Sequence, residues 1–174
     1  LLLPFFLFLH SFEAKCQLRI GGEPPSSTFN LPGNVSGMIT VPPPDLAVTR
    51  LEDDKYPSPY RFGIIIPVDV SPDNSGSWTT LADGTSIWRA TVSASGALAL
   101  SVYFDKFHIP EGGKLFIYNP DKSMVIGAFS ALNNSKSGLF ATELIPGSII
   151  TLEYVKPSGS DLFPLLHLNE ISYA

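Results

Sequence analysis

The stretch of residues 76–119 constrains the fold more than any other part of this sequence. Its apolar and polar residues alternate over several short runs, and turn-forming residues separate these runs. Such alternation is typical of consecutive antiparallel strands, because successive side chains of a strand point to opposite faces. Within residues 86–93, Trp88, Ala90 and Val92 fall on one face, which we expect to be buried. The stretch therefore predicts a β-sheet.

A turn signal and a second alternating run strengthen this prediction. Asp83-Gly84 lies between the two tryptophans and supplies the positive φ that a tight hairpin turn requires. After the hairpin, apolar residues occur at every second position of residues 98–104, which does not fit one face of a helix. The residues expected on the buried face of this run are Leu98, Leu100, Val102 and Phe104.

Turn signals continue to the end of the chain, at intervals of about eight to twelve residues, which is typical of an all-β sandwich. The 16 prolines and 14 glycines supply many of these turns and leave little room for helix. A chain of 174 residues with 44% hydrophobic content is long enough for one domain with a substantial core. We predict an all-β fold, an antiparallel, jelly-roll-like β-sandwich of about eight strands over residues 61–174.

Residues 1–16 have the composition of a secretory signal peptide. An apolar run is followed by Ala14-Lys15-Cys16, so we expect cleavage between Cys16 and Gln17 and a secreted, extracellular protein. The run is too short to span a bilayer. Lipidation of Cys16 is the alternative, although Lys15 fits it poorly. After cleavage the protein has no cysteine, so its stability must come from its core.

Both ends of the sequence indicate a module of a longer protein. The apolar run is preceded neither by a methionine nor by the positively charged region that a signal peptide normally carries. The last residues still alternate like a strand and stop without a terminal turn. We therefore expect that the sequence is clipped at both ends.

Residues 17–60 are rich in proline and predict an extended arm that lies against the sheet. Proline lacks the backbone donor and restricts the residue before it, which disfavours long hydrogen-bonded elements. Residues 38–41 and 46–48 are apolar enough to dock on the sheet. The charged residues 51–55 predict a solvated turn rather than an acidic metal site, which would need carboxylates spaced around a glycine.

The charged and titratable residues do not predict a catalytic site. The net charge of −5 and the mixed charges argue against a nucleic-acid surface, which needs clustered Lys and Arg. Outside the leader only His108 and His167 are available as bases, and we expect both to be structural. Glu143 and Glu153 alternate with apolar neighbours and are expected to face solvent rather than to form a glycosidase pair. We predict no catalytic, cofactor-binding or metal-binding residue, and no enzyme in this segment.

Aromatic residues and loops are the remaining candidates for binding. Trp88 shares its face with small apolar residues and is expected in the core, whereas Trp78 is a candidate to bind a sugar ring. The loops at 110–113 and 133–138, and the arm at 42–59, are available for contact with a protein. The aromatic residues considered for a sugar platform are Trp78, Trp88, Tyr103 and Tyr118. The candidate partner or ligand surface consists of Trp78, Glu111, Asn133 and Asn134.

Several short motifs follow one another in a defined order along the chain. A tryptophan, a DG turn and a W-R strand precede an S-G-A segment, an F-x-I-P-x-G-G turn, an L-x-I-Y strand, a G-A-F segment and an E-Y-x-x-P strand end. The residues that form these motifs are Trp78, Asp83-Gly84, Trp88-Arg89, Ser95-Gly96-Ala97, and residues 107–113, 115–118, 127–129 and 153–157. As an ordered set they resemble the N-terminal non-catalytic region of secreted lysyl-endopeptidase-like, trypsin-type serine proteases.

This resemblance implies a non-catalytic pro-segment or accessory domain of an exported serine endopeptidase precursor. It covers nearly all residues after the leader, and it implies that a protease domain follows residue 174 and is the partner of this domain. The histidine, aspartate and serine of that family lie in the missing domain, so no catalytic residue is carried over. The alternative function is a carbohydrate-binding or adhesion module of a secreted or cell-surface protein.

Overall fold

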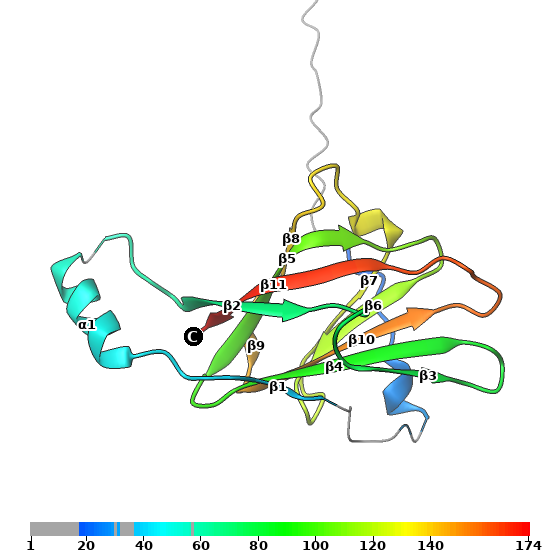
Figure 1. Ribbon diagram of the computed structural model, residues 1–174, viewed down its shortest axis with the longest axis horizontal. Helices are drawn as coiled ribbons and strands as arrows, with labels where there is room; N and C mark the ends of the chain where they lie inside the picture. The colour runs from blue at the N-terminus through cyan, green and yellow to red at the C-terminus, as the bar shows by residue number, and fades with distance from the viewer. Residues whose placement is uncertain (1–17, 30, 32–36, 57) are drawn as a thin grey trace, which may run out of the picture.

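The chain folds into two β-sheets that face each other. The structure is a computed structural model that describes residues 18–29, 31, 37–56 and 58–174 (Figure 1). The expected signal peptide and its cleavage point lie outside the described residues. In the described part, no helix combines the length and the apolar character needed to cross a membrane.

Within the described residues, eleven strands form the two sheets, and their pairings are antiparallel except that of β1 with β4. The first sheet has the order β1 (Ile39–Val41), β4 (Ser86–Ala94), β10 (Ile149–Lys156), β6 (Lys114–Tyr118), β7 (Val125–Phe129), and β3 (Ser77–Thr80) also pairs with β4. The second sheet has the order β2 (Ile64–Val70), β11 (Leu165–Tyr173), β5 (Ala99–His108), β8 (Phe140–Ala141), and β9 (Ile145–Pro146) also pairs with β5. The predicted all-β sandwich is confirmed, and the three strands in excess of the expected eight (β1, β8 and β9) are two or three residues long.

The inner faces of the two sheets share one hydrophobic core. The three apolar residues expected on the inner face of β4 are buried there, and so are Leu100, Val102 and Phe104 of β5. A cluster of phenylalanines lies between the sheets, where the rings of Phe107 and Phe140 stack with their centroids 4.1 Å apart. Such pairs contribute about 0.5–1.5 kcal/mol beyond the burial of their area. The apolar residues at every second position of β4 and β5 are thus explained by packing of one face of each strand against this core.

Leu98 differs from the sequence-based expectation. It is 82% exposed, because it belongs to the turn before β5 and not to the strand. Its N–H donates a hydrogen bond to the carbonyl of Ala174 at 2.7 Å, which holds this turn beside the last residue of the chain. The alternation of side chains between the two faces of the strand therefore begins only at Ala99, the first residue of β5.

The predicted hairpin at Asp83-Gly84 joins β3 to β4. Gly84 has φ 86°, as the turn requires, and the Asp83 carboxylate accepts a hydrogen bond from the Thr85 N–H at 2.9 Å. The pairing places Trp78 opposite Trp88 on neighbouring strands. Trp88 is buried, as expected, and its indole N–H donates to the carbonyl of Ser75 at 2.8 Å.

The proline-rich arm contains a helix, which corrects the expectation of an extended segment with a solvated turn at 51–55. Helix α1 (Leu46–Lys55) begins after Asp45, whose carboxylate accepts hydrogen bonds from the N–H groups of Ala47 and Val48. The prolines before Asp45 mark the start of the helix and do not prevent it, because they lie outside its hydrogen-bonded turns. Leu46 and Val48 are 44% and 52% exposed, so the expected docking of 46–48 on the sheet is also wrong.

Candidate functional site

The four residues of the predicted partner surface come from different parts of the fold. Trp78 is half-buried in β3, where its ring packs edge-on against Tyr154 and Phe163, with centroids 6.2 and 5.7 Å away. Glu111 is exposed in the turn between β5 and β6. The two asparagines lie near the 3-10 turn η2 (Ala131–Asn133), between β7 and β8.

The side-chain amides of both asparagines form hydrogen bonds with backbone groups. The Asn134 side chain accepts from the Ile109 N–H at 2.8 Å and donates to the Ile109 carbonyl at 2.9 Å. This clamp brings the η2 loop to the end of β5, two residues from Glu111. The Asn133 side chain accepts from the Ser130 N–H at 3.0 Å and completes the capping box of η2, in which Ser130 is the N-cap. These amide groups stabilise loops, so a partner at this surface would meet loops of fixed shape.

His167 joins three strands of the second sheet. Its Nδ1 lies 2.5 Å from a carboxylate oxygen of Asp105 on β5, and its Nε2 lies 3.1 Å from one of Asp69 on β2. Hydrogen bonding to Asp105, above all, raises the pKa of His167. Both ring nitrogens are engaged by carboxylates, so neither is free to take a proton from a nucleophile in this arrangement.

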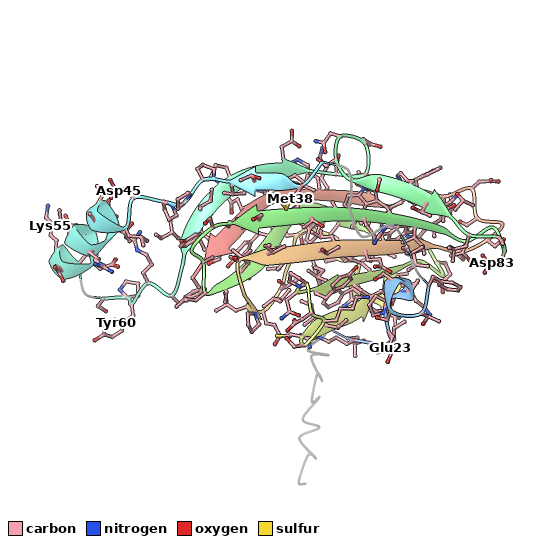
Figure 2. The ribbon with its side chains drawn as sticks, turned by 90° about the horizontal axis from the view of Figure 1, so that it is seen from below. Glu23, Met38, Asp45, Lys55, Tyr60 and Asp83 are labelled. Atoms are coloured by element: carbon pink, nitrogen blue, oxygen red, sulfur yellow. The ribbon has the colours of Figure 1, made fainter. Side chains whose placement is uncertain are left out.

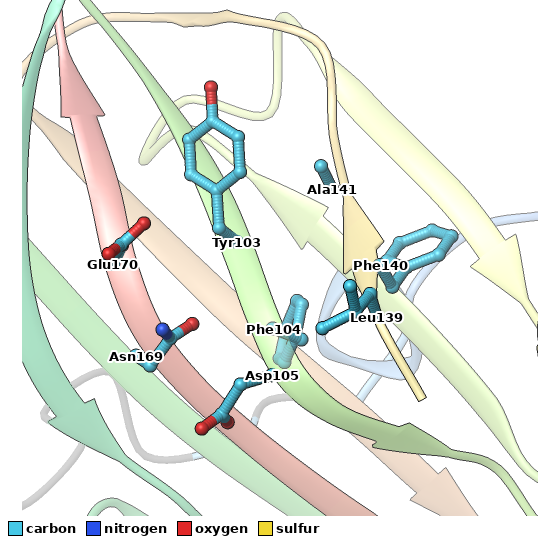
Figure 3. A pocket seen from close by; sticks show the side chains of 8 residues that line it. All are labelled: Tyr103, Phe104, Asp105, Leu139, Phe140, Ala141, Asn169 and Glu170. Atoms are coloured by element: carbon cyan, nitrogen blue, oxygen red, sulfur yellow. The ribbon is translucent and has the colours of Figure 1, made fainter. Parts of the chain in front are cut away.

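A shallow groove of about 370 Å³ lies beside this cluster on the outer face of the second sheet (Figure 3). Tyr103 and Asp105 of β5 line one part, Asn169 and Glu170 of β11 another, and residues 139–141 at β8 the third. Asn169 falls where the register between β11 and β5 shifts, and such bulges re-aim side chains. A half-buried tyrosine beside carboxylates and an amide can contact a small polar ligand such as a sugar ring. The described residues contain no group of three or more His, Cys, Asp or Glu arranged to hold a metal ion.

Glu153 corrects the expectation that it faces solvent. It is fully buried on the outer face of the first sheet. The Tyr118 hydroxyl donates to its carboxylate at 2.5 Å, and the Ser26 N–H donates at 2.9 Å. Arg89 lies directly opposite Glu153 on β4. Burial and, after it, the charge of Glu153 raise the pKa of Tyr118 well above its ordinary value.

The N-terminal segment from Leu18 explains this burial, because it crosses the outer face of the first sheet. Ile20 donates to the Ala128 carbonyl of β7 at 3.1 Å, Arg19 pairs with Glu143, and Lys122 donates to the Ser27 hydroxyl at 3.1 Å. An outward position on a strand is solvent-facing only when no other segment covers it. Here a distant segment supplies the cover, so alternation along β10 did not reveal the burial of Glu153.

Helix α1 and the segment that follows it form a projection, which we define as residues 45–56 and 58–62. Figure 1 shows α1 standing away from the two sheets, and Figure 2 places Asp45, Lys55 and Tyr60 at one end of the molecule, with Asp83 at the other. Arg61 ties the returning segment to the helix, with its nitrogens 2.9 Å from a Glu52 oxygen and 3.0 Å from an Asp53 oxygen. These ion pairs raise the pKa of Arg61, the hydrogen bond to Glu52 most of all.

Apolar side chains of the projection point into solvent. Leu51, Tyr60 and Phe62 are 71%, 91% and 70% exposed. Val48 and Leu51 are three residues apart and so lie on the same side of the helix. A helix of ten residues has little stability in water by itself, and this one adds few apolar contacts to the sandwich, because none of its residues is buried. The projection is therefore the strongest candidate for a protein-docking element in the described chain.

No protein-family model matches the sequence. The resemblance of its ordered motifs to the N-terminal region of the serine proteases therefore remains a prediction.

Proposed function

We propose that this chain is the non-catalytic N-terminal pro or accessory domain of an exported, trypsin-like serine endopeptidase precursor, and that it acts by docking on its protease domain. The observation that carries the proposal is the α1 projection. It presents apolar side chains on a helix held away from the core, and an amphipathic helix that fills an apolar groove of a partner is a common mode of recognition.

Exposure of these side chains has a physical cost that a partner would remove. Fully burying a Leu or Phe side chain is worth roughly 1.5–3 kcal/mol, and exposed apolar patches on soluble domains mark interaction sites. The charges around them are of both signs, since Arg50 and Lys55 accompany Glu52 and Asp54 on the same helix. An apolar centre with a mixed polar rim is the composition of a protein–protein interface.

The resembling motifs support the proposal through their places in the fold. Gly96 of the S-G-A segment has φ 87° in the turn between β4 and β5, and Gly112 has φ 78° in the turn between β5 and β6. The L-x-I-Y residues form β6, and Glu153 begins the E-Y-x-x-P segment on β10. These positions build turns and core, so the likeness concerns the scaffold, and the activity would belong to the domain that follows.

Co-expression tests the proposed function. The protease domain would be produced alone, in its full precursor, and together with this chain as a separate polypeptide. We expect the chain to raise the yield of mature protease or to inhibit it, in cis and in trans. A protease that matures at the same rate and keeps the same activity in all three cases would overturn the proposal.

The groove at Tyr103 favours a second candidate function, the binding of a glycan. Burial of Trp88 and packing of Trp78 remove the tryptophan pair as a sugar platform, so Tyr103 is the aromatic residue left to stack on a sugar within the groove. Glycan-array binding that Tyr103→Ala abolishes, with the fold unchanged, would favour this function. Absence of binding to any glycan would discard it.

A further inference from the structure

Helix α1 can open without disturbing the core of the sandwich. None of its ten residues is buried, and so short a helix has little stability without packing. At its C-terminal end, the Tyr56 N–H donates to the Glu52 carbonyl at 2.8 Å, and the Lys55 ammonium lies 5.1 Å from the centre of the Tyr56 ring. Segments with few buried contacts open locally at a much lower free energy than the whole domain. The last turn of α1 therefore opens while the two sheets stay folded.

Exposed ion pairs tie the helix to the segment that returns to β2. Arg61 pairs with Glu52 and Asp53, whose side chains are 54% and 46% exposed. Ion pairs in contact with water contribute little to stability, because water screens them. They do not prevent local opening of the projection.

The bond between Lys55 and Tyr56 lies where the helix ends. Both residues are exposed, and Figure 2 places Lys55 at one end of the molecule. Arg50 lies in the middle of α1, so access to the bond after it requires more of the helix to open. Arg61 must leave two carboxylates before it can enter the specificity pocket of a protease. Among the basic residues of the projection, Lys55 thus has the most accessible bond.

Other basic residues of the described chain lie in segments that the fold holds more firmly. Lys136 is exposed, but its loop is fixed by the two hydrogen bonds between Asn134 and Ile109. The Ile20 N–H, next to Arg19, donates to a carbonyl of β7. The basic residues within strands are Arg89, Lys106, Lys114 and Lys156.

We infer that the Lys55–Tyr56 bond is a processing site for an endopeptidase that cuts after lysine. Hydrolysis breaks the C–N bond between these residues and adds one water molecule, so Lys55 gains a carboxylate and Tyr56 an amino group. The enzyme needs a pocket with a carboxylate that pairs with the lysine ammonium, as trypsin has. This inference does not depend on the proposed function, because it concerns the projection of this chain alone.

The two pieces are expected to stay together after the cut. The piece before the cut keeps β1 paired with β4, and Val41 of β1 is part of the core. The Ser26 N–H of the same piece donates to the buried carboxylate of Glu153. Processing therefore produces a folded, two-chain form in which α1 is no longer joined to the segment before β2.

Limited digestion of the native 174-residue chain with trypsin tests this inference. Mass spectrometry identifies the bonds in the order in which they are cut, and size-exclusion chromatography shows whether the pieces separate. We expect cutting after Lys55 to be at least about tenfold faster than cutting after Arg61 or Lys136, because cleavage follows the population of the open form. The two pieces are expected to elute together.

Three variants complete the test. Lys55→Gln removes the side chain that the protease pocket binds and is expected to slow cutting in the projection at least about tenfold. Lys136→Gln is the matched control at another exposed lysine and is expected to leave the rate after Lys55 unchanged. Asp45→Ala removes the N-cap and is expected to speed the cut about fivefold, because it raises the population of the open helix.

Several results would overturn the inference. Cutting first after Arg61 or Lys136, or an unchanged rate of cutting in the projection of Lys55→Gln, would show that Lys55 is not the processing site. Pieces that separate on the column would show that the cut does not leave a folded two-chain form. Each of these results leaves the co-expression test of the proposed function unaffected.

Discussion

Removal of the Tyr118 hydroxyl tests the buried polar cluster that the N-terminal segment covers. In Tyr118→Phe, the carboxylate of Glu153 loses the donor that lies 2.5 Å away and keeps the Ser26 N–H at 2.9 Å. Because Glu153 has no exposure, water cannot replace the lost donor without opening the structure. A hydrogen bond to a buried charged group is worth about 1.5–3 kcal/mol.

We therefore expect Tyr118→Phe to lower the free energy of unfolding by about 2 kcal/mol. For a domain of this size, this corresponds to a fall of about 4–8 °C in Tm. Urea denaturation at pH 7 and scanning calorimetry measure both quantities. Tyr103→Phe is the matched control, since Tyr103 lies in an open groove on the other sheet, and it is expected to stay within about 0.5 kcal/mol of the native chain.

A double-mutant cycle with Glu153→Gln separates this bond from other effects of the ring. With the charge removed, Tyr118→Phe is expected to cost about 1 kcal/mol less than in the native chain. If Tyr118→Phe matches Tyr103→Phe in stability, or if the cycle shows no coupling between the two positions, the hydroxyl does not stabilise the buried carboxylate and this reasoning is refuted.

Three further predictions concern the fold and the other residues of the site. Because the pKa of His167 is raised by Asp105 and Asp69, its contribution to stability is present below about pH 6.5 and is lost as the pH rises through the raised pKa. Denaturation is expected to show a lower free energy of unfolding at pH 8 than at pH 5.5, and the His167→Gln variant is expected to lack this histidine-dependent difference. A variant with the same pH dependence as the native chain would contradict the pairing of His167 with the two carboxylates. Gly76→Ala is expected to cost about 2–3 kcal/mol, because φ is 73° and a Cβ would lie 2.2 Å from the Arg89 carbonyl. Gly147→Ala, with φ 105° but open space, is expected to cost only about 1 kcal/mol, and equal losses of Tm would refute the steric argument. Asn134→Ala removes the two hydrogen bonds that the amide makes with the buried backbone of Ile109, so the free energy of unfolding in urea is expected to fall by about 2 kcal/mol. An unchanged free energy of unfolding would show that these two hydrogen bonds are dispensable.

The strands were predictable where one face is buried and a turn is marked by glycine. Trp88, Ala90 and Val92 alternate because β4 presents them to the core, and the Asp83-Gly84 turn has the required φ. Leu98 obeys the same spacing but lies one residue outside β5, since spacing alone does not show where a strand begins. Local periodicity thus predicts which residues form strands better than it predicts their ends.

Helix α1 and the burial of Glu153 were missed for different physical reasons. The helix depends on a local cap, Asp45, among prolines that taken together disfavour regular structure. Glu153 is buried by a segment more than a hundred residues earlier, and no local pattern carries that contact. His167 likewise meets Asp69 and Asp105 only because β11 lies between β2 and β5, an order that turn spacing does not determine.

The candidate docking site was predictable only in part. The arm at residues 42–59 was predicted to be available to a partner, but the helix that presents Leu51 was not foreseen. Leu98 was assigned to the core, and its exposure became visible only once the structure placed the β4–β5 turn beside Ala174.

Direct titration of the proposed protease domain, produced separately, with this 174-residue chain tests the proposed function most directly. Isothermal calorimetry is expected to show saturable binding of one chain per protease domain, with a negative heat-capacity change from burial of apolar surface. The Leu51→Asp and Phe62→Asp double variant, which changes two exposed apolar side chains of the projection, is expected to bind at least about tenfold more weakly. No binding at concentrations up to about 100 μM, together with unchanged protease activity, would contradict the claim that this sandwich is a docking domain for a protease.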